Sequence, residues 1–356
     1  MPSMILEKVA GLETSYTEPT LADYPGRPTA LAKIIHRCLL SAVLLAASPF
    51  GVAVEQPGVG IEVQPLTSGI TEEAFQTLLV AKALKALGYQ VKPIQKMGYA
   101  AGHIALANGA ATFMASHWDP LHADFYQQAG GDLKLYRGGA YISNCVQGYL
   151  IDKRIATAFG IRTIAELQNP KIASLFDADG DGKADLAGCS PGWGCAKVIE
   201  RHLDAYGLRD TVTHHQGSYA ALIADTIARY EQLQPILYYT WTPFWVSGTL
   251  VPDQDVVWLP VPPDEVGAVD AALGSGFQIN VQRIVANREW VEANPAAARL
   301  FDVMQLDDKS VSAQNLVMHN GEDSAADINR HADAWIKAHR WTFDAWLEQA
   351  RGAAAD

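Results

Sequence analysis

Apolar residues follow two alternating patterns along most of this chain. Short apolar runs, typical of buried strands, alternate with longer stretches in which apolar residues recur every three or four positions, as they do in helices. The pattern predicts strands at 60–63, 90–94, 111–115, 134–136, 148–151, 211–214, 236–239 and 256–261. It predicts helices at 75–87, 99–108, 164–167, 196–206 and 219–230, and a mainly helical remainder after residue 261.

The first of these helices has clear end signals in the sequence. Thr71 is expected to be the N-cap, and Glu72 and Glu73 follow in the first turn, where acidic side chains interact favourably with the helix dipole. Gly88 directly follows the last apolar position and is expected to end the helix.

Strands that alternate with helices predict an α/β protein built on parallel sheets. The chain has 356 residues, more than one hydrophobic core usually serves, so two lobes are expected. Ligands of such sheets bind beyond the carboxyl ends of the strands. Trp118 and Trp241 stand just past two predicted strand ends, which marks them as candidate site residues.

Three short segments place tryptophans beside Gly, Pro or Cys, residues typical of loops. They are 117–122 (HWDPLH), 192–195 (GWGC) and 239–245 (YTWTPFW). A quaternary ammonium has no N–H to donate, so the negative faces of indole rings suit it, at about 0.5–2 kcal/mol each. A single tryptophan is more often a packing residue, and the chain has nine of them. Three in loop contexts together favour a cation-binding box.

Composition and charge narrow the classes of partner. Apolar residues make up 49% of the chain and charged residues 19%, as in ordinary globular proteins. The formal net charge of −12 argues against nucleic acid and against an anionic membrane surface as partners.

The N-terminal region has the features of a secretory signal. A basic segment ending at Arg37 precedes the apolar run 38–47, and Gly51 and Ala53 occupy the −3 and −1 positions of a cleavage after Ala53. Residues 1–26 precede any normal signal, and an over-long start assignment explains them. The apolar run is shorter than the roughly 20 residues that span a bilayer. The mature protein is expected to be exported and soluble.

Export makes the cysteines informative. Cys189 and Cys195 flank the turn-rich segment 190–194, and an oxidising compartment favours a disulfide between them. A zinc site is a weaker interpretation, because no histidine pair accompanies them at a suitable spacing. Cys145 is expected to be a buried free thiol.

An acidic loop follows the predicted helix at 164–167. Its carboxylates stand at positions 1, 3, 5 and 9 of a calcium-loop pattern with a glycine at position 6: Asp177, Asp179, Asp181, Asp185 and Gly182. Position 12 is a glycine rather than the bidentate glutamate. A calcium-binding loop and a plain solvated turn both remain open, and either would be structural.

Motifs for catalysis are scarce. The sequence has no nucleophile elbow, no zinc-protease motif, no phosphate-binding loop and no dinucleotide fingerprint. His214 and His215 allow a metal or acid–base site, although paired histidines at a strand end are more often packing or solvated residues. His122 follows Trp118 by four residues, so a turn would bring it to the same cavity as a donor to an anionic group.

Several ordered motifs together resemble the periplasmic glycine betaine/proline betaine-binding proteins of osmoprotectant ABC importers. The likeness runs from about Gly58 to the segment 335–339. The motifs that carry it are 70–73 (ITEE), 118–122 (WDPLH), 147–152 (QGYLID), the 177–185 loop, 192–195 (GWGC) and 239–245 (YTWTPFW). The chain departs from the family pattern at His117 and Asp119, and Asp119 adds a carboxylate near the first tryptophan.

The resemblance implies a role for each candidate residue. Trp118, Trp193 and Trp241 would box the trimethylammonium group. His122 and the backbone amides of Gly194 and Cys195 would hold the carboxylate, and the family's disulfide maps onto Cys189–Cys195. A helix starting at these amides would favour an anion there.

The resemblance also implies an architecture. It is a type II-like periplasmic-binding-protein fold of two α/β lobes, each with a central mixed or parallel sheet flanked by helices. The ligand lies in the cleft between the lobes, and closure occurs about a hinge. Residues 1–53 would be removed, residues 54–145 and 248–356 would form lobe one, and 146–247 lobe two. The mature protein is expected to be a periplasmic monomer that delivers its ligand to the permease and ATPase of an ABC importer and catalyses no reaction.

Two rival functions remain at this point. Another quaternary amine, such as choline or carnitine, would also suit a tryptophan box, but choline has no carboxylate for His122 to hold. A secreted calcium-dependent hydrolase built around the 177–185 loop, His214 and His215 is the rival from another class, and the lack of a nucleophile motif weighs against it.

Overall fold

The computed structural model describes residues 56–262 and 277–354. Two five-stranded sheets form the framework of these residues. The strands are β1 (Glu62–Val63), β2 (Pro65–Thr67), β3 (Gln90–Val91), β4 (Gln95–Lys96), β5 (Phe113–Asp119), β6 (Leu135–Cys145), β7 (Gln147–Asp152), β8 (Ala184–Ala187), β9 (Val212–His215), β10 (Leu237–Trp241), β11 (Val256–Leu259) and β12 (Asn280–Asn287). The first sheet has the order β4-β2-β5-β12-β6 and the second β11-β7-β10-β8-β9. Strands β1 and β3 form a separate parallel pair.

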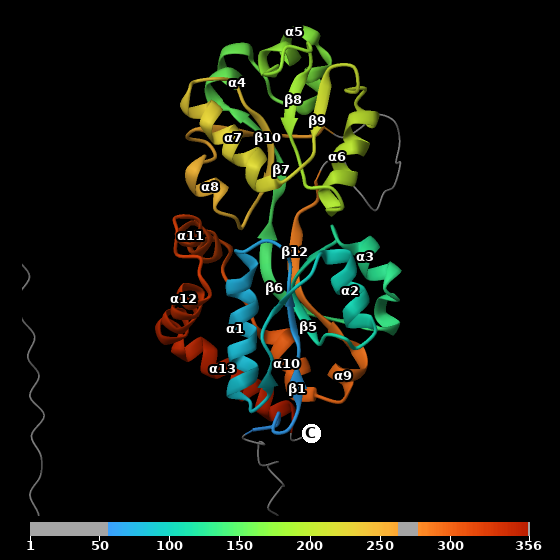
Figure 1. The fold of residues 1–356 in the computed structure, drawn as a ribbon, viewed down its shortest axis with the longest axis vertical. Coiled ribbons are helices and arrows are strands. Elements are labelled where there is room, and N and C mark those ends of the chain that lie inside the picture. The colour runs from blue at the N-terminus through green and yellow to red at the C-terminus, as the bar shows by residue number, and fades with distance from the viewer. Residues whose placement is uncertain (1–55, 263–276, 355–356) are drawn as a thin grey trace, which may run out of the picture. The chain divides into compact units, whose positions relative to one another are not determined.

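Helices cover both faces of the sheets, as Figure 1 shows for α1 and α2 on either side of the first sheet. The α-helices are α1 (Glu73–Ala86), α2 (Tyr99–Ala107), α3 (Ala123–Gln128), α4 (Lys153–Phe159), α5 (Pro170–Ala173), α6 (Gly194–Ala205), α7 (Tyr219–Glu231), α8 (Val246–Thr249), α9 (Arg288–Glu292), α10 (Pro295–Val303), α11 (Asp308–His319), α12 (Ala325–Ala338) and α13 (Arg340–Ala353). Short 3-10 turns lie at Gly131–Leu133, Ile164–Gln168 and Ser174–Phe176. No helix in the described ranges is both long enough and apolar enough to cross a membrane.

Central strands are the most deeply buried elements. Every residue of β7 and of β10 is buried, because neighbouring strands flank them and helices pack on the sheet. Such strands have nearly continuous apolar sequence rather than alternation. That continuity is the signal from which the sequence predicts both strands correctly.

Both sheets are mixed, whereas strand–helix alternation alone predicted parallel ones. Strand β12 runs antiparallel between β5 and β6, and β7 runs antiparallel to β10 and β11. The described part of the remainder after residue 261 is mainly helical, as expected, but it also contains β12, which the sequence did not predict. Residues 280–287 lie next to helical segments in the sequence, and the two strands that β12 pairs with come from much earlier in the chain.

Two local expectations also need correction. The residue before α1 is Glu72, which makes no capping bond through its side chain, so Thr71 is not the N-cap. The helix predicted near 164–167 is a 3-10 turn. By contrast, Gly88 has a φ of +93°, a conformation that favours glycine, and it follows the end of α1 as expected.

The first sheet continues into the second through β6 and β7, which follow each other with one residue between them (Figure 1). Strand β11 lies after residue 248, where the chain was expected to return to the first lobe, yet it pairs with β7 in the second sheet. Strand β11 pairs with the edge of β7 that lies opposite β10. The division at residues 54, 146 and 248 otherwise stays a prediction, and residues 1–53 lie outside the described residues.

Candidate functional site

One cleft gathers residues from both sheets and the helices beside them. Its lining residues are Ile70, Tyr99, Trp118, Leu121, His122, Trp193, Gly194, Cys195, Tyr239 and Trp241. All six residues predicted from the sequence to touch a ligand are among them. They come from three segments that are more than 40 residues apart in the chain.

The three tryptophans stand at the ends of regular elements. Trp118 lies near the end of β5, Trp241 ends β10, and Trp193 directly precedes α6. The rings of Trp193 and Trp241 have centroids 5.7 Å apart at an angle of 76°, so they present two nearly perpendicular faces. Such an arrangement of π faces suits a rounded cation without N–H groups.

Packing behind Trp241 fixes its ring. Phe244 stacks on Trp241 with ring centroids 4.3 Å apart. Tyr219 lies 4.7 Å from Trp241 and 5.7 Å from Trp193, and its hydroxyl donates to the Tyr239 carbonyl at 2.9 Å. The box is therefore rigid before a ligand arrives, which lowers the entropy cost of binding.

His122 has one hydrogen-bonding state in this environment. Its Nδ1 accepts the Trp118 backbone N–H at 3.2 Å, so the proton of the neutral ring is on Nε2. Burial holds the pKa of His122 well below its ordinary value, and nearby His117 and His103 lower it further. His122 therefore offers the cleft a neutral N–H donor.

The start of α6 supplies a second set of donors. Gly194 and Cys195 are the first two residues of this helix, so their N–H groups have no partner within it. A Cβ at position 194 would lie 2.9 Å from the Leu121 carbonyl oxygen, so only glycine lets the α6 end approach the β5–α3 connection so closely. The positive end of the helix dipole and these amides suit an anionic group.

The cleft thus places aromatic faces close to N–H donors, an arrangement that suits a cation and an anion side by side. The chain is similar in sequence to known proteins. The family profile described as the substrate binding domain of ABC-type glycine betaine transport systems matches residues 62–338. The chain belongs to this family. A glycine betaine-binding periplasmic protein of Dickeya dadantii (strain 3937) is 52% identical over 336 residues, which cover 92% of this chain and 99% of the relative.

Further relatives agree with this membership. A glycine betaine/proline betaine-binding periplasmic protein of Escherichia coli (strain K12) is 51% identical over 320 residues, 88% of this chain and 96% of the relative. These relatives are periplasmic, which supports a periplasmic location here. The family consists of substrate-binding components of ABC importers rather than of enzymes.

Solved structures confirm the two-lobed periplasmic-binding-protein fold. Lactococcal OpuAC, in its closed-liganded conformation complexed with glycine betaine, matches with a TM-score of 0.64 at 20% identity over 81% of this chain and 99% of that chain. An ABC-transporter choline binding protein in complex with choline matches with a TM-score of 0.63 at 15% identity over 82% and 96%. At these identities the likeness concerns the fold alone.

The cysteines of this family member have the predicted states. Cys189 and Cys195 form a disulfide, and Cys145 is a buried free thiol at the end of β6. The disulfide joins the end of the β8 connection to the first turn of α6. It therefore closes the short loop that carries Trp193.

Replacing both Cys189 and Cys195 with serine is expected to weaken betaine binding more than it weakens folding. So small a loop contributes only about 2 kcal/mol through chain entropy, so the thermal midpoint should fall by only a few degrees. Trp193 and the α6 amides would lose their fixed geometry, and calorimetric Kd values should rise about tenfold. Unchanged affinity, or two free thiols found by mass spectrometry in periplasmic protein, would reject the expectation.

Asp119 does not contribute its charge to the box, although it is next to Trp118 in sequence. Its carboxylate accepts from Arg283 Nε at 2.8 Å and lies 3.4 Å from Arg137 Nη1. It is absent from the residues that line the cleft. Arg283 is on β12, the strand that the sequence did not predict, so the pairing was invisible in the sequence.

Tyrosines complete the site and were missed by sequence reasoning. Tyr99 lines the cleft with its ring 4.3 Å from that of His122, and its hydroxyl donates to buried Glu73 at 2.8 Å. Burial raises the pKa of Glu73 to about 7. Tyr239 also lines the cleft, and its hydroxyl donates to Gln147 at 2.6 Å. The only sequence signal was their position at a predicted helix start and strand end.

Two further histidines lie behind His122. His103 Nδ1 donates to the Tyr99 carbonyl at 2.7 Å, so its Nε2 accepts from His117 Nδ1 at 2.8 Å. Burial lowers the pKa of both rings, most strongly for His117. Each is thus a neutral core residue. Both ring nitrogens of His103 have partners, whereas His117 Nε2 is buried without one.

Buried neutral histidines are expected to make folding sensitive to acid. In the second lobe, burial lowers the pKa of His202 from 6.5 to about 4. The unfolded chain binds protons below its ordinary pKa of 6.5 and the folded chain does not, so stability is complete above that pH and falls between about 6.5 and 4. His202 alone accounts for about 3 kcal/mol over this window.

Urea unfolding at several pH values measures this loss. His202→Asn, which cannot titrate, should show a shallower decline on acidification than the unmodified protein. A free energy of unfolding that is flat from pH 7 to pH 4.5 would contradict the assignment of neutral histidines.

The acidic loop brings its carboxylates close together. Ligand atoms of Asp177, Asp179 and Asp181 lie within 4.8 Å of one another, and so do those of Asp179, Asp185 and His215. Backbone N–H groups within the loop donate to these carboxylates, for example Gly180 to Asp177 at 2.6 Å. Calcium binding by Asp177, Asp179, Asp181 and Asp185 stays a prediction.

Proposed function

We propose that this protein captures glycine betaine and proline betaine in the periplasm and delivers them to the permease and ATPase of an ABC importer. The observation that carries the proposal is the shared cleft. Its lining includes Trp118, Trp193 and Trp241 together with His122 and the first two residues of α6. A betaine is a zwitterion with its charges a few ångströms apart, so it needs both at once.

The carboxylate donors favour betaines over choline. Choline would fill the tryptophan box, but His122 Nε2–H and the amides of Gly194 and Cys195 would then have lost water without gaining an anion. The names of the two curated relatives support the same ligands. Carnitine carries its carboxylate farther from its ammonium group than the betaines do, so its two charges are spaced differently.

Further parts of the proposal follow from its role as a carrier. The protein acts as a monomer, closes its two lobes on the ligand and catalyses no reaction. Its secretory signal is removed near Ala53. Separately, we propose a structural calcium ion in the 177–185 loop, because carboxylates at these loop positions suit a hard cation.

Titration calorimetry tests the ligand assignment. Purified mature protein is titrated with glycine betaine, proline betaine, choline and carnitine, and the two betaines are expected to bind most tightly. Intrinsic fluorescence should change with the same ligands, because binding alters the surroundings of three indoles. Tighter binding of choline than of both betaines, or no binding of any of the four, would overturn the proposal.

A further inference from the structure

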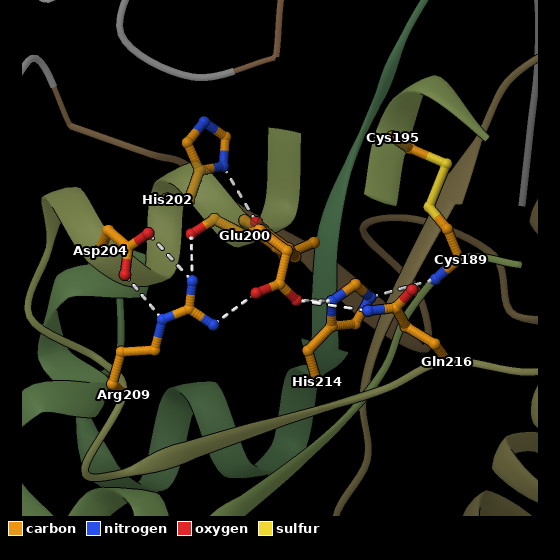
Figure 2. A network of polar contacts seen from close by, with 9 residues as sticks. Cys189, Cys195, Glu200, His202, Asp204, Arg209, His214 and Gln216 are labelled. Carbon is orange, nitrogen blue, oxygen red and sulfur yellow. Dashed lines mark hydrogen bonds and ion pairs between the residues drawn. A yellow bond between two sulfur atoms is a disulfide. The ribbon is translucent and has the colours of Figure 1, made fainter. Parts of the chain in front are cut away.

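The loop that carries Trp193 is anchored at its far end by a histidine outside the cleft. His214 Nδ1 donates to the Glu200 carboxylate at 2.6 Å, and His214 Nε2 accepts the Cys189 backbone N–H at 3.4 Å (Figure 2). A backbone N–H can only donate. The two contacts together therefore require the neutral ring with its proton on Nδ1.

The packing around His214 is as specific as its hydrogen bonds. Its side chain is 2% exposed, and it lies on β9 opposite Leu186 of β8. A Cβ at position 188 would lie 2.0 Å from His214 Nε2, so the imidazole rests directly on the Gly188 backbone. Any side chain at 188 would push the ring out of place.

Glu200 links this histidine to the helix that begins in the cleft. It lies on α6, one and a half turns after Cys195. Arg209 forms ion pairs with both Glu200 and Asp204 on the same helix (Figure 2). His214 therefore joins the Cys189 end of the loop to the body of α6, while the disulfide joins Cys189 to the first turn of α6.

We propose that neutral His214 is a positioning residue for the betaine site: it holds Cys189 against α6, and so sets Trp193 and the Gly194 and Cys195 amides in their binding geometry. The inference rests on the proposed function. It also assigns the site a sensitivity to acid, because a protonated ring would turn an Nε2–H toward the Cys189 N–H. Two donors cannot share that contact, and the loop would shift.

The groups that face His214 determine when this happens. Burial lowers the pKa of His214, Glu200 on α6 raises it, and the charges of His215 on β9 and of Arg209 lower it. Gln216 also contacts Glu200, at 3.4 Å, and it does not titrate. Because the binding-competent form is the neutral one, affinity should fall as the pH drops through this pKa.

Three variants test the proposal by calorimetric Kd for glycine betaine between pH 7.5 and pH 5. His214→Ala should weaken binding about tenfold at pH 7.5, since it loses both contacts of the ring. His214→Gln can donate to Glu200 and accept from Cys189, so it should bind within about threefold of the unmodified protein. Residue 214 cannot titrate in this variant, so its affinity should fall less on acidification than that of the unmodified protein.

His215→Ala is the matched control. His215 is the next residue on β9, and its side chain also pairs with a carboxylate, that of Asp185, whereas the Cys189 N–H bonds to the His214 ring. This variant should retain the unmodified affinity at pH 7.5. Because the charge of His215 lowers the pKa of His214, the variant's loss of affinity on acidification should begin at a higher pH. His122 and Glu73 are present in every variant, so differences between the profiles isolate residue 214.

The outcomes separate this inference from the function on which it rests. If the unmodified protein binds no betaine, the proposed function fails. If it binds, and His214→Ala matches His215→Ala in affinity, or His214→Gln keeps the full pH dependence, the positioning role is wrong. Should His214→Ala not fold, as judged by circular dichroism, the pH profile of His214→Gln still decides.

Discussion

Trp118→Ala, Trp193→Ala and Trp241→Ala are each expected to weaken glycine betaine binding by about 1–3 kcal/mol, because each removes one desolvated face of the cation box. Trp241 should have the largest effect. Its ring contacts Phe244 and Tyr219 as well as the cleft, so truncation also loosens the neighbours that keep the box rigid. Calorimetric titration of each purified variant measures the loss.

Matched substitutions separate the cation–π contribution from damage to the fold. Trp→Phe at each position keeps a smaller aromatic face and should lose less than Trp→Ala. Trp341, 85% exposed on α13, serves as a control whose replacement by alanine should leave Kd unchanged. Wild-type affinity in all three cleft variants would exclude the box.

His122→Ala is expected to cost glycine betaine about 1–3 kcal/mol, the range for a lost hydrogen bond to a charged group. Choline has no carboxylate and should lose much less on the same variant. A packing defect would weaken the binding of both ligands alike, so choline serves as the control. Equal losses would make His122 structural and leave the carboxylate to the Gly194 and Cys195 amides.

The pH dependence of His122 has a definite sign. A histidine that bound the carboxylate as an imidazolium would lose affinity as the pH rises through its pKa. Here Nδ1 accepts from the Trp118 N–H and burial depresses the pKa, so the donor is neutral and its bond persists at higher pH. Affinity that falls steadily between pH 6.5 and 8.5 would contradict this assignment.

Much of the binding site could be predicted from local sequence. Trp193 stands between two glycines and two residues before Cys195, and Trp241 stands two residues before Pro243, so their loop-like neighbours set them apart from core tryptophans. The start of α6 was equally visible, because the apolar spacing of 196–206 begins just after Gly194. These signals lie within a few residues of each other and need no partner from elsewhere in the chain.

The sequence by itself determined most of the alternation of strands and helices, the two deeply buried strands β7 and β10, the Cys189–Cys195 pair and the six residues gathered at the cleft. Only the tertiary structure decided the antiparallel place of β12, the pairing of Asp119 with Arg283, the support of His122 by Tyr99, and the contact of His214 with Cys189. Each of these depends on a partner 20 or more residues away. The charge of a carboxylate and the tautomer of an imidazole follow from the groups that folding brings within hydrogen-bond distance, and sequence spacing does not encode those distances.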